Sequence, residues 1–213
     1  NMGGMGFIEN NKAECMLSVL INTNFLRASL KNSVKKYFFS SSACVYNASK
    51  QKDTFVAALK EEDAYPADPE DGYGWEKLFS ERFYLAASRN YGLDIRIARF
   101  HNIFGPEGSW KDGREKAPAA FCRKVAKAKN LGEIEMWGDG KQTRCFTYVK
   151  DAVVAVEQLM ERKSNGIFHI GSNFEHSVEE VINTTIEILN VDLSIEHINT
   201  DELYSGKYED IYK

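Results

Sequence analysis

Tyr73 and Lys77 are the two residues whose types and spacing most directly indicate chemistry in this chain. In a helix, a spacing of four residues puts both side chains on one face. A phenol has an unperturbed pKa of roughly 10 and is a poor base at neutral pH, but a nearby ammonium favours the phenolate. The pair therefore predicts a tyrosine that exchanges protons. The same spacing also occurs on ordinary solvated helix faces, so the pair needs support from its surroundings.

The composition excludes several other kinds of function. A net charge of −4 over 213 residues provides no electrostatic footprint for nucleic acid. The four cysteines are scattered with no C-x-x-C pair, which argues against a metal site and a disulfide scaffold and favours a reducing compartment. No apolar run reaches the roughly 18–20 residues that span a bilayer, and the pattern of a signal peptide is absent. We therefore expect a cytoplasmic protein.

Strand-like and helix-like segments alternate along the chain. Hydrophobic periodicity and capping residues predict helices over Asn11–Asn32, Tyr73–Tyr91, Ala117–Asn130, Asp151–Arg162 and Ser177–Asn190. Alternating or short apolar runs predict strands over Lys35–Phe39, Leu93–Phe100, Ile134–Trp137, Ile167–Ile170 and Leu193–Ile198. This alternation indicates an α/β fold with a largely parallel sheet. The irregular segment from Asn47 to Asp71 ends just before Tyr73, which suits a loop over a site.

One element of nucleotide-binding sheets is missing. Such folds normally open with a strand, a G-x-G-x-x-G turn and a helix. The Gly-Gly-Met-Gly run at residues 3–6 has no strand before it and cannot be that turn. We therefore expect that the first βαβ unit is absent from this chain and that the natural polypeptide is longer.

Further motifs stand in a fixed order around the tyrosine and lysine. A Ser-Ser-Ala-Cys-Val-Tyr run at 41–46 follows a predicted strand, an Arg-Phe-His-Asn-Ile-Phe-Gly-Pro run occupies 99–106, and a Phe-Thr-Tyr-Val-Lys-Asp-Ala run occupies 146–152. This order resembles the extended short-chain dehydrogenase/reductases that act on nucleotide sugars. The resemblance implies a Rossmann-like doubly wound sheet, NAD as cofactor, and a small C-terminal α/β region for the substrate. It assigns 1–104 to the remaining NAD-binding domain and 105–213 mainly to the substrate region, with about 142–172 returning to the sheet.

Within that family the chain is most similar to the GDP-mannose 3,5-epimerases of plants. The similarity is clearest at residues 3–7, 99–103, 113–124 and 136–144. It implies conversion of GDP-mannose to GDP-L-galactose, a step of ascorbate biosynthesis, by transient oxidation at carbon 4, inversion at carbons 3 and 5, and re-reduction. It also implies a homodimer formed through the helix that carries Tyr73 and the helix before it.

The resemblance assigns roles to individual residues. Tyr73, supported by Lys77 and Ser42, would exchange the proton of the sugar 4-hydroxyl, and both Tyr73 and Lys77 would contact NAD. Cys44 and Lys116 would remove and return protons at carbons 3 and 5. The implied substrate contacts are Gly3, Ser42, Ala43, Cys44, Asn102, Glu115, Lys116, Ala117, Lys124, Gln142, Thr143, Arg144 and Lys207. Among them, Lys124 and Arg144 would bind the diphosphate.

Other interpretations remain open for these residues. A free cysteine such as Cys44 is more often a small buried hydrophobe, and Lys116, Lys124 and Arg144 have the types common on any surface. At the C-terminus Lys207 stands in place of a family arginine, and a lysine cannot make the bidentate contact. The alternatives are another nucleotide-sugar epimerase or dehydratase that uses the same tyrosine and lysine, or a truncated relative that binds a nucleotide or partner without turnover.

Overall fold

A computed structural model describes residues 5–51, 58–128 and 132–198, so the predicted site residues Gly3 and Lys207 lie outside the described residues. The helices are α1 (Met5–Asn10), α2 (Lys12–Met16), α3 (Ser18–Lys31), α4 (Gly72–Tyr91), α5 (Ala117–Ala128), α6 (Val149–Glu161) and α7 (Val178–Leu189). The strands are β1 (Lys36–Ser42), β2 (Asp94–Phe100), β3 (Ile103–Phe104), β4 (Glu133–Trp137), β5 (Thr143–Cys145), β6 (Thr147–Tyr148), β7 (Gly166–Ile170), β8 (Glu175–Ser177) and β9 (Ser194–Ile198). Short 3-10 helices are η1 (Ala43–Val45), η2 (Ala48–Gln51) and η3 (Glu61–Ala64).

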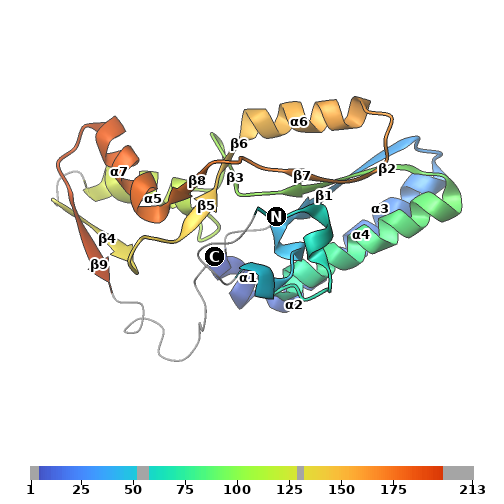
Figure 1. Cartoon of the computed structure of the whole chain (residues 1–213), viewed down its shortest axis with the longest axis horizontal. Helices are drawn as coiled ribbons and strands as arrows, with labels where there is room; N and C mark the ends of the chain where they lie inside the picture. Colours follow the sequence, from blue (N-terminus) through green and yellow to red (C-terminus); the bar gives the residue numbers. More distant parts are fainter. Residues whose placement is uncertain (1–4, 52–57, 129–131, 199–213) are drawn as a thin grey trace.

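The predicted α/β fold is confirmed, and the long predicted elements are present with small shifts at their ends. The main difference is at Leu17, where the helix predicted over Asn11–Asn32 is interrupted. The break lets α2 pack against the start of α4 while α3 runs along the rest of that helix (Figure 1). No helix in the described ranges combines the length and apolar character needed to cross a bilayer.

The sheet region is a parallel sheet in the order β1-β2-β7, with α3 and α4 on one face and α6 on the other (Figure 1). Residues of β2 alternate between the two faces. Ile95 and Ile97 pack with Tyr84 of α4, whereas Ala98 packs with Leu159 of α6. Both faces of the central strand are therefore buried, as expected for a parallel sheet.

The remaining elements form a smaller lobe. The parallel pair β4–β9 packs with α5 and α7, and its buried core consists of Val125, Ala128, Ile134, Met136 and Ile182. A capping box between Ser177 and Glu180 begins α7. Its two bonds run from the Glu180 N–H to the Ser177 Oγ at 3.0 Å and from the Ser177 N–H to the Glu180 Oε2 at 2.9 Å.

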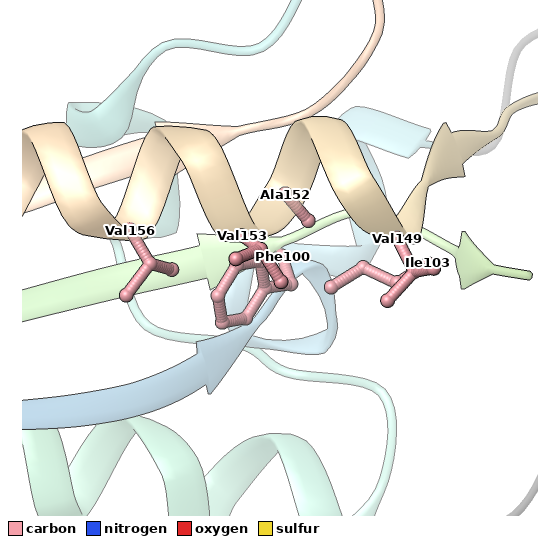
Figure 2. Close-up of a pocket in the computed structure, with 6 residues that line it drawn as sticks. All are labelled: Phe100, Ile103, Val149, Ala152, Val153 and Val156. Carbon is pink, nitrogen blue, oxygen red and sulfur yellow. The ribbon is translucent and has the colours of Figure 1, made fainter.

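An apolar hollow lies between α6 and the ends of β2 and β3 (Figure 2). It is lined by Phe100, Ile103, Val149, Ala152, Val153 and Val156. Such a lining offers no side-chain donor or acceptor for a sugar or a phosphate. The hollow also lies on the α6 face of the sheet, away from α4 and its tyrosine. This hollow is therefore a poor candidate for the binding of a sugar nucleotide.

Candidate active site

The start of α4 is fitted closely against η1. Asp71 caps the helix by accepting a hydrogen bond from the Gly74 N–H at 2.6 Å. A Cβ on Gly74 would lie 2.2 Å from the Cys44 carbonyl oxygen, so a residue with a side chain cannot occupy this position without a shift. The glycine inside the Tyr-x-x-x-Lys run therefore lets the helix bring Tyr73 beside the segment that carries Ser42 and Cys44.

Tyr73 and Lys77 lie on one face of α4, as their spacing predicts. The Lys77 Nζ is 5.6 Å from the centroid of the Tyr73 ring and 4.8 Å from that of Phe39. It donates a hydrogen bond to the Ser40 carbonyl oxygen at 3.0 Å, at the carboxyl end of β1. Burial lowers the pKa of Lys77, and the carboxylates of Glu76 and Glu81 partly oppose this shift.

The expected direction of the Tyr73 pKa is wrong. We expected the Lys77 ammonium to lower it, but burial raises the pKa of Tyr73 well above its ordinary value, and the charge of Cys44 adds to the rise. A hydrogen bond with Ser42 lowers the pKa only in part. The physical reason is that the phenol is desolvated in a site where Cys44 and nearby carboxylates disfavour a second negative charge. Tyr73 thus holds its proton at neutral pH in the protein alone.

Cys44 and Lys116 come together beside this tyrosine. Cys44 is half-buried in η1, and its N–H donates to the Ser42 Oγ at 3.3 Å. Lys116 directly precedes α5; burial lowers its pKa, and the negative charge of Cys44 opposes that shift. The thiol therefore interacts electrostatically with both the amine and Tyr73. The structure thus gathers Ser42, Cys44, Tyr73, Lys77 and Lys116 from distant parts of the sequence.

Asn102 connects this cluster to the strands of the smaller lobe. Its backbone lies in the left-handed region with φ of 33°, which asparagine tolerates better than most residues. Its Nδ2 donates to the Cys145 carbonyl oxygen at 3.1 Å, and its own carbonyl accepts from the Thr147 N–H at 3.2 Å. The side chain therefore fixes the loop after β2, and its predicted contact with substrate stays a prediction.

Glu115 and Lys124, two of the predicted substrate contacts, form hydrogen bonds with other residues of the smaller lobe. The Glu115 carboxylate accepts from the Gly113 N–H at 2.8 Å and pairs with Arg123 at 2.7 Å. The Lys124 Nζ donates to the Glu135 carbonyl oxygen at 3.2 Å, and burial lowers its pKa. These bonds hold the loop before α5 and tie α5 to β4.

The last predicted group lies on and before β5. Thr143 pairs with Ser177 of β8 and Arg144 with His176, and the carbonyl of Gln142 accepts from the Val178 N–H at 3.0 Å. Burial lowers the pKa of Arg144 to about 10. A desolvated guanidinium is stabilised by an anionic partner, which fits a phosphate. Ala43 and Ala117 are the first residues of η1 and α5.

Sequence reasoning missed a group of buried aromatic and charged side chains next to this cluster. His101 stacks on His169, and Tyr46 joins them, with the buried Arg99–Glu81 ion pair behind. His101 belongs to the Arg-Phe-His-Asn-Ile-Phe-Gly-Pro run at 99–106, and this membership was the one sign in the sequence that it could be functional. Its stacking partner, His169, could not be found in the same way, because their contact depends on the register of β2 and β7.

With this geometry established, the comparisons with known proteins identify the family. Residues 7–171 match the NAD dependent epimerase/dehydratase family. The chain belongs to this family. NAD is accordingly its cofactor, and the predicted Rossmann-like fold agrees with the match.

The curated relatives belong to the same group of enzymes that the sequence motifs resemble. The chain is 42% identical over 211 residues to GDP-mannose 3,5-epimerase of Arabidopsis thaliana and 43% identical over 211 residues to GDP-mannose 3,5-epimerase 1 of Oryza sativa subsp. indica. Each alignment covers 99% of this chain and 55% of the relative, so the chain spans about half the length of the curated relatives it matches. A solved UDP-glucose 4-epimerase of Thermotoga maritima matches the fold with a TM-score of 0.79 at 24% identity, covering 93% of this chain and 62% of that one.

The cluster fits part of an NAD molecule. Lys77 uses one ammonium donor on the Ser40 carbonyl, and an ammonium has three donors. Tyr73 and Lys77 stand near the carboxyl ends of parallel strands, where doubly wound sheets bind ligands. These donors suit the hydroxyl groups of the nucleotide. Within the described ranges no glycine-rich turn joins a strand to a helix in the pattern that holds the diphosphate of NAD.

Proposed function

We propose that this chain carries the acid–base centre of a GDP-mannose 3,5-epimerase, which converts GDP-mannose to GDP-L-galactose. The observation that carries the proposal is the placement of Cys44 and Lys116 together beside Tyr73. Inversion at carbons 3 and 5 needs one group to remove a proton and another to return one from the opposite face. A 4-epimerase needs no such second pair. The names of the curated relatives support the same reaction.

In this mechanism Tyr73 exchanges the proton of the sugar 4-hydroxyl, and Ser42 holds the phenol through a hydrogen bond. NAD, when bound near Tyr73 and Lys77, supplies a positive charge beside the phenol and the acceptor for the hydrogen and electron pair removed from carbon 4. The resulting ketone acidifies the hydrogens on carbons 3 and 5. Cys44 and Lys116 then exchange those protons, and burial lowers the pKa of the Lys116 amine below its ordinary value, so this amine releases a proton more readily.

The substrate contacts belong to the same proposal. Arg144 and Lys124 are the cations for the diphosphate, and the desolvation of both supports a role with an anion. We assign the NAD-binding part to 1–104 and the sugar-nucleotide part mainly to 105–213, with about 142–172 returning to the sheet. A cytoplasmic location and a role in ascorbate biosynthesis are part of the proposal too.

A homodimer is supported by exposed apolar side chains on α3, on α4 and at the residue just before α3. These are Leu17, Leu20, Ile21, Phe25, Trp75 and Phe79. On α4, Leu78 is buried in the chain's own core, whereas the next residue, Phe79, is 55% exposed. Light scattering measures the molar mass of the protein in solution. A protein that is purely monomeric at its working concentration would contradict a dimer formed through these side chains.

Solvent exchange tests the reaction. The full-length polypeptide that contains this chain is incubated with GDP-mannose and NAD in heavy water, and the sugar is analysed by NMR. Deuterium at carbons 3 and 5 is expected. Label at neither carbon would contradict the proposal and favour the other nucleotide-sugar epimerases or dehydratases.

Cys44→Ala gives the sharper comparison. It removes one of the two exchange groups, so labelling should fall by roughly 100-fold or more, the usual size for general acid–base groups. Formation of bound reduced nicotinamide should persist, because Tyr73 and Lys77 remain. The matched control is Cys122→Ala, an exposed cysteine of α5. Equal loss of both activities in the Cys44 variant, with normal folding, would show that the role assigned to this thiol is wrong.

A further inference from the structure

Two histidines stack at the carboxyl end of the central strands. His101 follows β2, and His169 lies in β7 opposite Arg99. Their ring centroids are 3.9 Å apart with an interplanar angle of 14°. The backbone N–H of His101 donates to the backbone carbonyl of Ile170 at 3.0 Å. A Cβ on Gly171 would lie 3.2 Å from both the His101 Cβ and the His169 Nε2, so this glycine leaves room for the stack.

The hydrogen-bonding atoms of the stack differ in their partners. The Nδ1 of His169 bonds to the Tyr46 hydroxyl at 2.9 Å, and the Arg99 guanidinium lies 5.0 Å from the centre of the Tyr46 ring. In contrast, the Nε2 of His101 is buried and has no hydrogen-bond partner among the residues that the structure describes. A buried nitrogen without a partner costs free energy unless a nearby group bonds to it in the working protein.

The charged groups that act on His101 include one possible donor for this nitrogen, the amine of Lys116. Burial lowers the pKa of His101 to about 3, and the positive charges of His169 and Lys116 add to the shift. His169 in turn faces Glu61 and Arg99. His101 is therefore neutral at physiological pH, and the Lys116 amine is near enough for its charge to act on the imidazole. A neutral imidazole can accept a hydrogen bond from an ammonium without repelling it.

We propose that His101 is a positioning residue of the active site, whose Nε2 accepts a hydrogen bond from the Lys116 ammonium and directs that amine toward the sugar. The proposal rests on the proposed function and deepens it. Lys116 exchanges its proton with the sugar carbon, and His101 itself gains and loses none. The stack on His169 and the anchor through Tyr46 fix the imidazole plane, so the amine has one preferred direction.

Two variants of His101 in the full-length enzyme test this role. His101→Phe keeps a flat ring on His169 but removes the nitrogen, and His101→Gln keeps a neutral acceptor. Without the acceptor the ammonium of Lys116 is less stabilised, so its pKa falls further. We expect the alkaline limb of the pH profile for deuterium uptake to move down by about one pH unit or more in the Phe variant. Uptake at neutral pH should fall roughly tenfold, with the KM for GDP-mannose unchanged.

The Gln variant should recover most of the uptake and the original limb, and His176→Phe, an exposed histidine of β8, serves as the matched control. An unchanged alkaline limb in the Phe variant would overturn the proposal, because it would show that His101 serves only to pack its ring, which phenylalanine does equally well.

A second measurement uses the wild-type protein and needs no active variant. Nitrogen-15 NMR of the wild-type histidines must show an unprotonated Nε2 for His101 at neutral pH, and a protonated Nε2 contradicts the proposal. Absence of label in the wild-type enzyme would instead contradict the proposed function.

Discussion

The sheet region and the smaller lobe are held together by different means. Within the described ranges, the buried charged side chains all belong to the sheet region and the elements around it: Asp71, Glu76, Glu81, Arg96 and Arg99. The core of the lobe is apolar, with residues such as Met136 and Ile182 almost fully buried. Buried charges in a low-dielectric interior shift neighbouring pKa values in addition to the shift that burial itself causes. The region that carries Tyr73, Cys44 and Lys77 is thus the one that also contains the buried charges.

This difference implies two kinds of sensitivity. Removal of one partner from a buried ion pair leaves an uncompensated charge, which is costly and local. Removal of a methyl group from an apolar core costs less and scales with the volume lost. Substitutions of the buried charges in the sheet region should therefore affect stability and chemistry together, while those in the apolar core of the lobe should affect stability alone.

The largest effect is expected from Arg99→Met. Arg99 donates to the two carboxylate oxygens of Glu81 at 2.9 and 2.7 Å, and the Ser41 hydroxyl donates to the same carboxylate at 2.5 Å. Loss of the guanidinium leaves Glu81 buried with one neutral donor. The free energy of unfolding should fall by about 3–5 kcal/mol, measured by urea denaturation.

The double variant Arg99→Met with Glu81→Met distinguishes charge from packing. Replacement of a whole buried pair by apolar residues is often nearly neutral. The double variant should therefore be clearly more stable than the single one. If its loss equals or exceeds that of Arg99→Met, the pair contributes through packing and the contrast between the two regions is wrong.

Gly74→Ala is expected to have a smaller effect on stability and a large one on activity. The added Cβ meets the backbone oxygen of Cys44 at 2.2 Å, so α4 must move away from η1. Overpacking of this kind costs about 1–3 kcal/mol. A shift of Tyr73 relative to Cys44 of about 1 Å can lower the rate roughly 100-fold. Steady-state epimerisation and thermal unfolding measure the two effects.

Gly72→Ala is the matched control in the same helix turn. Its Cβ would meet the end of the Met16 side chain at 3.0 Å, which can turn aside. This variant should keep most of its stability and activity. Equal losses in the two variants would show that the first turn of α4 tolerates no side chain at either position, and that the contact with Cys44 is not special.

The fold was predictable where a segment repeats one pattern long enough. The apolar stripe and capping box of Ser177–Asn190 predicted α7 because local periodicity determines such a helix. The break at Leu17 was not predictable, since it follows from how α2 and α3 pack against α4. The two-residue strands β3 and β6 were missed because they contain too few residues to show a period.

The sequence predicted which residues gather in the candidate site better than it predicted the direction of their pKa shifts. Spacing placed Tyr73 and Lys77 on one helix face, and the structure agrees. The direction of the Tyr73 pKa depends on burial and on the nearby Cys44, which come from packing between α4 and η1. His101 and His169 meet through the register of β2 and β7. A sequence pattern carries neither kind of information.

The smallest effect is expected from Ile182→Val in the core of the lobe. The side chain is fully buried between α5, α7 and β4, so loss of one methyl group should cost about 0.5–1.5 kcal/mol. Ile188→Val, on the exposed side of the same helix, is the control and should change stability less. Deuterium uptake at carbons 3 and 5 should stay within about twofold of wild type in both, because both residues lie in α7, outside the cluster around Tyr73 and Cys44. If uptake fell strongly at nearly unchanged stability, the core of the lobe would be coupled to Cys44 and Lys116, and the two regions would work as one.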